Sequence, residues 1–265
     1  MYATATVPGD LAPWVQAIWY SEGRLDAARE RVLPAAAADI VANLGAPIRL
    51  IEGEGPAAIR GTTTSGLLTR PLVLHHPEVH RVIGLQLHPL GVPMLLGLPL
   101  RALNDRVVAL ADVLQSGRDE LVERCVDART PTQALARAIA WLRARLRSVE
   151  PRLDPVTRWA VEQIERGRGQ LATTTLQRAS GYGATRFRDR FVDVMGIGPK
   201  VYARLVRFRR LLDELAPDVP LAQLAHAAGL VDQAHLNREF RQFSGQTPTE
   251  ILAARYPSGL TVAEA

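Results

Sequence analysis

The last third of the chain contains one residue pattern written twice. Two sets of five residues share the same internal spacing, and each member of the second set lies 49 residues after its counterpart in the first. Apolar residues four positions apart share one face of a helix, glycine ends the helix, and proline starts the next one. Each set therefore predicts a helix, a stop and a new helix. The first set is Phe187, Phe191, Gly196, Pro199 and Tyr202, and the second is Leu236, Phe240, Gly245, Pro248 and Ile251.

A shorter helix and a tight turn precede each copy. Before the second copy, residues 221–228 have helical spacing, Gly229 begins a turn, and Asp232 is the expected N-cap of the next helix. Before the first copy, residues 171–180 and 181–183 have the same arrangement, and a helix is expected over residues 184–195. Each unit is therefore predicted to be a helix-turn-helix.

One helix over about residues 199–215 joins the two units, and Pro217 and Pro220 end it. A rigid connection of this kind is expected to set two recognition helices about one DNA turn apart, roughly 34 Å.

The segment DQAHLNREFRQFSGQTPTEI, residues 232–251, closely resembles the second helix-turn-helix of AraC/XylS-type transcription regulators. The resemblance covers roughly residues 154–256. It implies a C-terminal DNA-binding domain with two such units and an N-terminal effector or dimerisation domain. The first unit departs from the family pattern at Gln177 and Ser180 of its first helix and at Gly183 of its turn.

The N-terminal half predicts a different kind of fold. Short extended runs separated by glycine and proline predict a small β-sandwich or barrel, and this is where the family usually places a cupin-like sensor. From Asp105 onward the apolar period becomes helical, with one stripe ending at Cys125 and a second after Pro131. The helical pair packs either on the sheet or against a second copy of the chain, and both alternatives stay open. The extended runs are residues 31–33, 39–44, 48–51, 72–75 and 79–88.

A second resemblance concerns this half. Residues 31–34, 39–45 and 84–114 resemble a poorly characterised N-terminal domain found in a subset of these regulators, which identifies no ligand. The expected fold class is α+β with two domains. Residues 1–150 form a β-rich sensor or dimerisation domain with a sandwich or barrel and a helical pair, and residues 151–265 form an all-α domain with two helix-turn-helix units.

The charge of one segment supports a polyanionic partner better than the net charge of the whole chain does. The formal net charge is +5 and the isoelectric point is about 10.0, but Lys200 is the only lysine, and an arginine-rich composition can have other origins. Residues 184–210, however, include eight basic residues and only two acidic ones. The local excess of positive charge lies on the predicted first unit and the connecting helix.

Other features favour a soluble, cytoplasmic protein. Three prolines and three glycines interrupt the uncharged run over residues 82–100, which would break a membrane-spanning helix. No basic segment precedes an apolar stretch at the N-terminus, so no secretion signal is predicted. Cys125 is the only cysteine, and a buried apolar role is favoured over a reactive thiol sensor.

Histidines are the candidates for metal binding. His75, His76, His80 and His88 lie close together in the sequence, and Glu78 is the only nearby acid. Without a convergent carboxylate we favour structural or surface histidines and predict no metal and no cofactor. No Ser-His-Asp order, phosphate-binding glycine loop or paired-cysteine spacing suggests catalysis, so we expect no enzymatic activity.

The family resemblance implies which residues contact DNA. In the second unit the base-reading positions are Gln233, His235, Asn237 and Arg238, whose side chains suit hydrogen bonds to base edges. In the first unit they are Thr185, Arg188 and Asp189, with Arg186 beside them, while Arg204 and Arg207 on the connecting helix are candidates for phosphate contacts. Asp189 departs from the family pattern, and a local ion pair with Arg186 or Arg190 is expected instead.

The sequence therefore predicts a transcription regulator that acts as an activator or a repressor. Double-stranded DNA is its expected partner, and RNA polymerase, a small-molecule effector and a second copy of the chain are candidate partners. Two alternatives stay open. One is a cupin-type metal-binding or enzymatic domain fused to a DNA-binding module, and the other is a protein-interaction adaptor that keeps the helical fold without DNA affinity.

Overall fold

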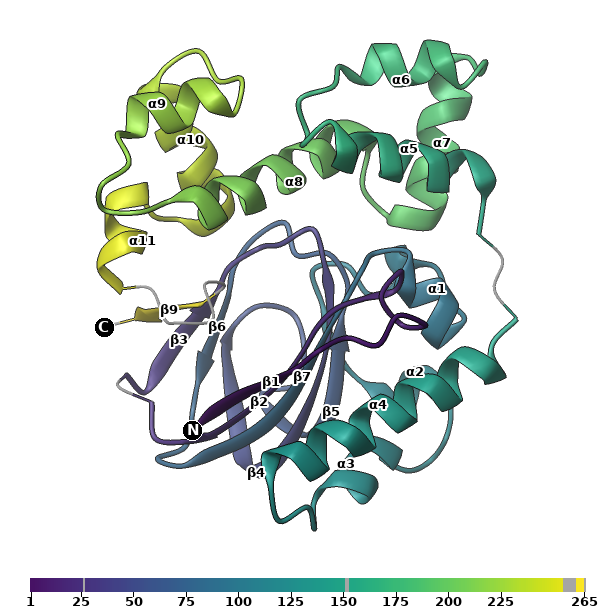
Figure 1. The fold of residues 1–265 in the computed structure, drawn as a ribbon, viewed down its shortest axis with the longest axis vertical. Helices are drawn as coiled ribbons and strands as arrows, with labels where there is room; N and C mark the ends of the chain where they lie inside the picture. The colour runs from purple at the N-terminus through teal and green to yellow at the C-terminus, as the bar shows by residue number, and fades with distance from the viewer. Residues whose placement is uncertain (26, 151–152, 255–260, 265) are drawn as a thin grey trace.

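The computed structural model describes residues 1–25, 27–150, 153–254 and 261–264. A curled antiparallel sheet with helices on one side forms the N-terminal half, and a helical part lies across one end of it (Figure 1). This arrangement confirms the predicted α+β fold class, with the β-rich half in the form of a half-barrel. The expected boundary between Glu150 and Pro151 adjoins residues 151–152, which lie outside the described residues.

The sheet follows the order β1-β2-β7-β4-β6-β3-β9, and β5 pairs with β4 and β8. Its neighbouring strands are antiparallel throughout. The extended runs predicted at residues 39–44 and 48–51 are one long strand, and the strands over residues 2–5, 15–23 and 58–65 were not predicted. The strands are β1 Tyr2–Ala5, β2 Val15–Gly23, β3 Arg29–Val32, β4 Ala38–Glu52, β5 Ala58–Ser65, β6 Leu72–His75, β7 His80–Leu87, β8 Val107–Ala109 and β9 Thr261–Glu264.

Asn43 shapes the bend in β4. The pairing of β4 with β5 is irregular between Asn43 and Ile48. Within this irregular segment the Asn43 amide donates to the carbonyls of Ala46 at 2.9 Å and Ile59 at 3.1 Å, and its oxygen accepts from the Gly45 amide at 3.0 Å. One buried side chain thus satisfies backbone groups that the ladder leaves without partners.

Alternation along the strands gives the sheet two apolar faces. On β7, Ile83, Leu85 and Leu87 belong to the main core beneath the helices, while Val82 belongs to a smaller cluster on the other face. The pattern follows the two-residue period of a strand. Gly84 lies on the smaller cluster's face, where a Cβ would come within 2.0 Å of the Trp19 ring. Glycine at this position therefore makes room for the indole.

Helices cover the outer face of the sheet (Figure 1). They are α1 Gly91–Leu96, the short 3-10 turn Leu100–Ala102, α2 Leu110–Leu114, α3 Glu120–Cys125 and α4 Pro131–Ser148. Helix α4 contacts β1, β2 and β7 and buries Trp141 and Leu142. The helical pair therefore packs on the sheet, and its role in dimerisation stays a prediction.

The prediction of helical structure from Asp105 onward was wrong for its first residues. Residues 107–109 form strand β8, which pairs with β5 from Thr63↔Ala109 to Ser65↔Val107. The β-branched Val107 and Val108 suit a strand, and β5 offers them an edge to pair with.

The helical part reproduces the repeated sequence pattern. Its helices are α5 Pro155–Arg166, α6 Thr173–Ala179, α7 Ala184–Met195, α8 Pro199–Glu214, α9 Leu221–Ala227, α10 Gln233–Ser244 and α11 Pro248–Ala254. Gly196 and Gly245 end α7 and α10 in the left-handed conformation, with φ of 71° and 77°. Asp232 caps α10 by accepting from the His235 amide at 2.7 Å, as predicted.

Helix α8 spans the distance between the two helix-turn-helix units (Figure 1). Its Phe208 ring packs against Phe240 and Phe243 of α10, with ring centroids 5.2 Å apart in both pairs. At the other end Tyr202 packs against Phe191 of α7, with centroids 6.0 Å apart. These aromatic contacts fix both recognition helices on one rigid connector.

Polar contacts attach the first unit to the sheet domain. Asn104 donates to the Met195 carbonyl at the end of α7 at 2.7 Å, and Arg101 pairs with Asp193 at 2.9 Å. His88 lies 2.9 Å from Glu165 of α5, which also accepts from the Tyr202 hydroxyl. The carboxyl end of α7 is therefore docked on the sheet domain.

The end of the chain returns to the sheet. Strand β9 pairs with β3, from Arg29↔Glu264 to Val32↔Thr261, and Val262 is fully buried. Its sequence position, after the second helix-turn-helix unit, gave no indication of this pairing. The second unit thus has its own connection to the sheet.

Candidate nucleic-acid interface and internal cavity

The first recognition helix, α7, exposes its predicted base-reading positions. Thr185, Arg186, Arg188 and Asp189 are exposed near its amino end, on the part of the helix away from the contacts with the sheet domain. The ion pair expected between Asp189 and Arg186 or Arg190 was wrong. Asp189 lies 3.6 Å from Arg188, and the two other arginines have different neighbours.

Those two arginines stack on one ring. The guanidinium groups of Arg186 and Arg190 lie 5.2 and 5.1 Å from the centroid of the Tyr182 ring. Arg190 also forms an ion pair with Asp154, the N-cap residue of α5. Hydrogen bonds and the charge of Arg190 hold the pKa of the Asp154 carboxyl below its usual value, although burial opposes this. Arg190 therefore anchors α7, and Arg186 is oriented beside it.

The second recognition helix, α10, presents a similar surface. Gln233 and Arg238 are exposed, and His235 and Asn237 are half-buried at its amino-terminal turns. The buried face of the same helix holds Leu236. The sequence-predicted residues of each unit thus lie on one helix surface, and their contacts with bases stay a prediction.

A groove along α8 lies between the two units. It has a volume of about 570 Å³, and Lys200, Arg204, Arg207 and His235 contribute to its lining. Both predicted phosphate contacts therefore face the same groove. Arg204 is held by Glu239 of α10 at 2.9 Å, whereas burial lowers the pKa of Arg207 beside them.

The opposite face of α8 reaches the sheet domain. Residues two positions apart point in nearly opposite directions on a helix. Arg207 faces the groove, and Arg209 instead lines a cavity inside the half-barrel. Arg209 is held by Asp213 one turn later, at 3.0 and 3.1 Å from its two carboxylate oxygens. One helix therefore contacts both candidate sites.

The cavity has a volume of about 470 Å³ and a mainly apolar lining. Every member of the smaller apolar cluster lines it, as does Trp19. This volume falls within the range of about 300–1,000 Å³ that is usual for small-molecule sites. The cluster consists of Ile48, Ile59, Leu68, Leu72, Val82 and Val107.

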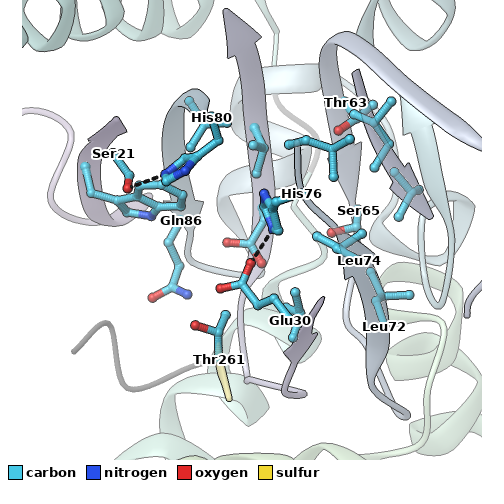
Figure 2. Close-up of a pocket in the computed structure, with 18 of the residues that line it drawn as sticks. Ser21, Glu30, Thr63, Ser65, Leu72, Leu74, His76, His80, Gln86 and Thr261 are labelled. Carbon is cyan, nitrogen blue, oxygen red and sulfur yellow. Dashed lines mark hydrogen bonds and ion pairs between the residues drawn. The ribbon is translucent and has the colours of Figure 1, made fainter. Parts of the chain in front are cut away.

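Two buried histidines border the cavity (Figure 2). His76 Nε2 lies 2.6 Å from a carboxylate oxygen of Glu30, and His80 Nε2 lies 2.8 Å from the Ser21 hydroxyl. Although burial opposes ionisation, the contact with His76 holds the pKa of Glu30 below its ordinary value. Among the described residues, no three histidine, cysteine or acidic side chains converge as metal ligands.

Asp39 is the ionisable group on β4 inside the half-barrel. It lines the cavity, its partner across the strands is Gln86, and the Gln86 side chain hydrogen-bonds to it. Burial raises the pKa of Asp39 to about 6, although the Gln86 bond and the charge of Arg209 act in the opposite direction. The sequence signal for this site is an acidic residue within the otherwise apolar run 38–42.

Cys125 is fully buried, as predicted. Burial raises the pKa of its thiol to about 11. A thiol with this pKa is almost entirely protonated at neutral pH, which argues against the reactive sensor. None of the helices in the described part of the chain combines the length and the hydropathy needed to cross a membrane.

Comparison with protein families separates the chain into the same two parts. Residues 176–254 match the family described as a helix-turn-helix domain. The helical part is an AraC-type helix-turn-helix domain. Residues 6–109 match a domain of unknown function, DUF6597. No curated protein matches the sequence.

Solved structures of ToxT from Vibrio cholerae share the fold of this chain. One, at 1.65 Å resolution, has 8% sequence identity and a TM-score of 0.52, and the match covers 90% of this chain and 98% of that chain. Another, with (E)-4-(8-methylnaphthalen-1-yl)but-3-enoic acid bound, has 9% identity and a TM-score of 0.51, with coverage of 90% and 99%. The similarity extends over both parts of the molecule.

Proposed function

We propose that this protein is a sequence-specific transcription regulator whose DNA affinity responds to a small molecule bound in the half-barrel. The observation that supports it most is the position of α8. The helix holds both recognition helices, lines the groove with Arg204 and Arg207, and lines the cavity with Arg209. A ligand that changes the surroundings of Arg209 acts on the element that sets the spacing of the recognition helices.

The shared fold supports the effector role. ToxT has been crystallised with a small aromatic carboxylic acid, and the cavity of this chain has the size and apolar lining of a small-molecule site. A ligand shifts an equilibrium only through different affinities for the two states. The effector is therefore expected to bind the DNA-competent and DNA-incompetent arrangements of α8 unequally.

The experiment that tests DNA binding begins with genomic fragments retained by the purified protein. We expect one sequence motif to be enriched and its affinity to fall steeply with salt, because arginines displace counterions from phosphates. A double variant, Arg188→Ala with Arg238→Ala, is expected to lose the motif preference. Retention of fragments without a shared motif would contradict sequence-specific binding, and no salt-dependent binding at all would favour the adaptor alternative.

Self-association is tested in the same experiments. Dimerisation makes the second binding event intramolecular, which raises affinity for paired sites by roughly 10²–10⁴ where geometry permits. Sedimentation of the full chain, with affinities for one-site and two-site DNA, measures this. RNA polymerase stays a predicted partner and requires transcription assays with the selected DNA.

A further inference from the structure

The polar lining of the cavity includes two carboxylates from neighbouring parts of the half-barrel. Glu30 and Asp39 contribute carboxylates to the lining, and His76 contributes an imidazole. His76 Nε2 lies 2.6 Å from the Glu30 carboxylate, so this ring nitrogen is already engaged. Among the described residues, nothing hydrogen-bonds to the buried Nδ1 of the same ring. The cavity therefore offers lone pairs to a ligand.

The positive charges around the cavity are already engaged. Arg209 is held by both carboxylate oxygens of Asp213. Arg24 pairs with Glu78, and both side chains are largely exposed to solvent. Burial and the nearby His76 lower the pKa of His80, which disfavours the charged form of its ring. An anionic ligand would have to displace an existing ion pair.

The two carboxylates are not equivalent. Glu30 is engaged by His76 at 2.6 Å and by a hydrogen bond from the Thr261 side chain. Asp39 has a neutral hydrogen-bonding partner in Gln86, and the cation that acts on it, Arg209, is held elsewhere. A carboxylate that lines an apolar cavity without a bound cation gains most from a positively charged ligand group.

We propose that the cavity binds an apolar amine whose ammonium group pairs with the Asp39 carboxylate. The smaller apolar cluster and Trp19 surround the hydrocarbon part of the ligand. Its N–H groups donate to the Asp39 carboxylate oxygens. The inference rests on the proposed effector role and names the chemical class of the effector.

The test uses three ligands that share one hydrocarbon frame: naphthylbutylamine, naphthylbutanol and naphthylbutyric acid. Calorimetric titration of the full chain is expected to show tightest binding for the amine and weakest for the acid. Asp39→Asn is expected to weaken amine binding about 10- to 100-fold, the range of a charge-assisted hydrogen bond, and to change alcohol binding little. Glu54→Gln is the control, because Glu54 pairs with Arg106 outside the cavity.

The outcomes separate this inference from the proposed function. Tighter binding of the acid than of the amine, unchanged amine affinity in Asp39→Asn, or no binding of any of the three ligands would overturn the amine assignment. DNA affinity measured with and without the amine is a separate readout. Amine binding that depends on Asp39 but leaves DNA affinity unchanged would support the ligand class and contradict the effector role.

Discussion

Arg204 of α8 and Glu239 of α10 form an ion pair in which the guanidinium contacts both carboxylate oxygens at 2.9–3.2 Å. The Arg204 and Glu239 side chains are only 21% and 8% exposed. The Arg204 guanidinium also lies 5.1 Å from the centroid of the Phe243 ring. The pair therefore joins the connecting helix to the second recognition helix, and Glu239 neutralises an arginine that the sequence suggested for phosphate contact.

Removing one partner of this pair is expected to destabilise the protein. Glu239→Ala leaves Arg204 partly buried without its carboxylate, which should lower the free energy of unfolding by about 2–4 kcal/mol, less than for a completely buried pair. Chemical denaturation of the variant and of Asp218→Ala, an exposed acid in the turn after α8, measures the difference. Equal stability of the two variants would contradict a structural role for the pair.

Arg204 and Arg207 should differ in the salt dependence of DNA binding. Arg207→Gln is expected to reduce the slope of log affinity against log salt by about 0.9, the contribution of one phosphate contact. Arg204→Gln should lower affinity and leave the slope nearly unchanged, because Glu239 already neutralises this arginine. Anisotropy titrations at several salt concentrations measure both slopes, and a reduced slope in both variants would assign a phosphate contact to Arg204 as well.

Arg238 is expected to read a base. Arg238→Ala should cost about 1–3 kcal/mol against the preferred site and little against random DNA, because a bidentate contact with guanine is sequence-dependent. Competition titrations with both kinds of DNA measure this difference. Equal losses on both would indicate a phosphate contact.

The second unit should contribute more of the base specificity than the first. Asp189 is exposed among the arginines of α7, where a carboxylate repels phosphate and can accept only from a base amino group. Substituting the binding site base by base should show one strongly constrained half-site and one that mainly positions the duplex. Two equally constrained half-sites one turn apart would contradict this asymmetry.

Asp39 should make stability depend on pH. Its pKa is about 6 in the folded protein and 3.8 in the reference state, so its contribution favours folding below pH 3.8 and is lost as pH rises through 6. Asp39→Asn should therefore be more stable than the native chain at pH 7–8, by roughly 2–3 kcal/mol at about 1.4 kcal/mol per pKa unit. The difference should shrink to less than about 1 kcal/mol near pH 4, because most of the carboxyl is then protonated in the folded state. Thermal unfolding from pH 4 to 8, with Glu54→Gln as control, measures the stability difference between Asp39→Asn and the native chain. A difference that does not change with pH would point to another cause.

Strand β9 should protect β3. Val262→Asp places a charge at a fully buried position and is expected to release β9 from the sheet. The amides of β3 that face β9 should then exchange with solvent faster, as hydrogen exchange would measure. Ala263→Ser is the matched control because Ala263 is only half-buried. Unchanged exchange in the Val262 variant would show that β9 contributes little to this edge.

The sequence by itself determined the helical part of the molecule. Helical spacing, the caps at Asp232, Gly196 and Gly245, and the proline starts are local signals, since each acts within one or two turns of the chain. Two copies at a fixed offset strengthened one another, which located both helices and the exposed positions that are predicted to contact DNA.

The cavity, and the contribution of Arg209 on α8 to its lining, became visible only in the tertiary structure. The lining combines Asp39, Gln86, Glu30 and Arg209, which lie far apart in the sequence and meet because the sheet curls and α8 crosses its end. The same is true of β9 on β3 and of Glu239 on Arg204. Strand register and helix docking are set by pairing and packing between distant segments, and no local periodicity records which segment will be the partner.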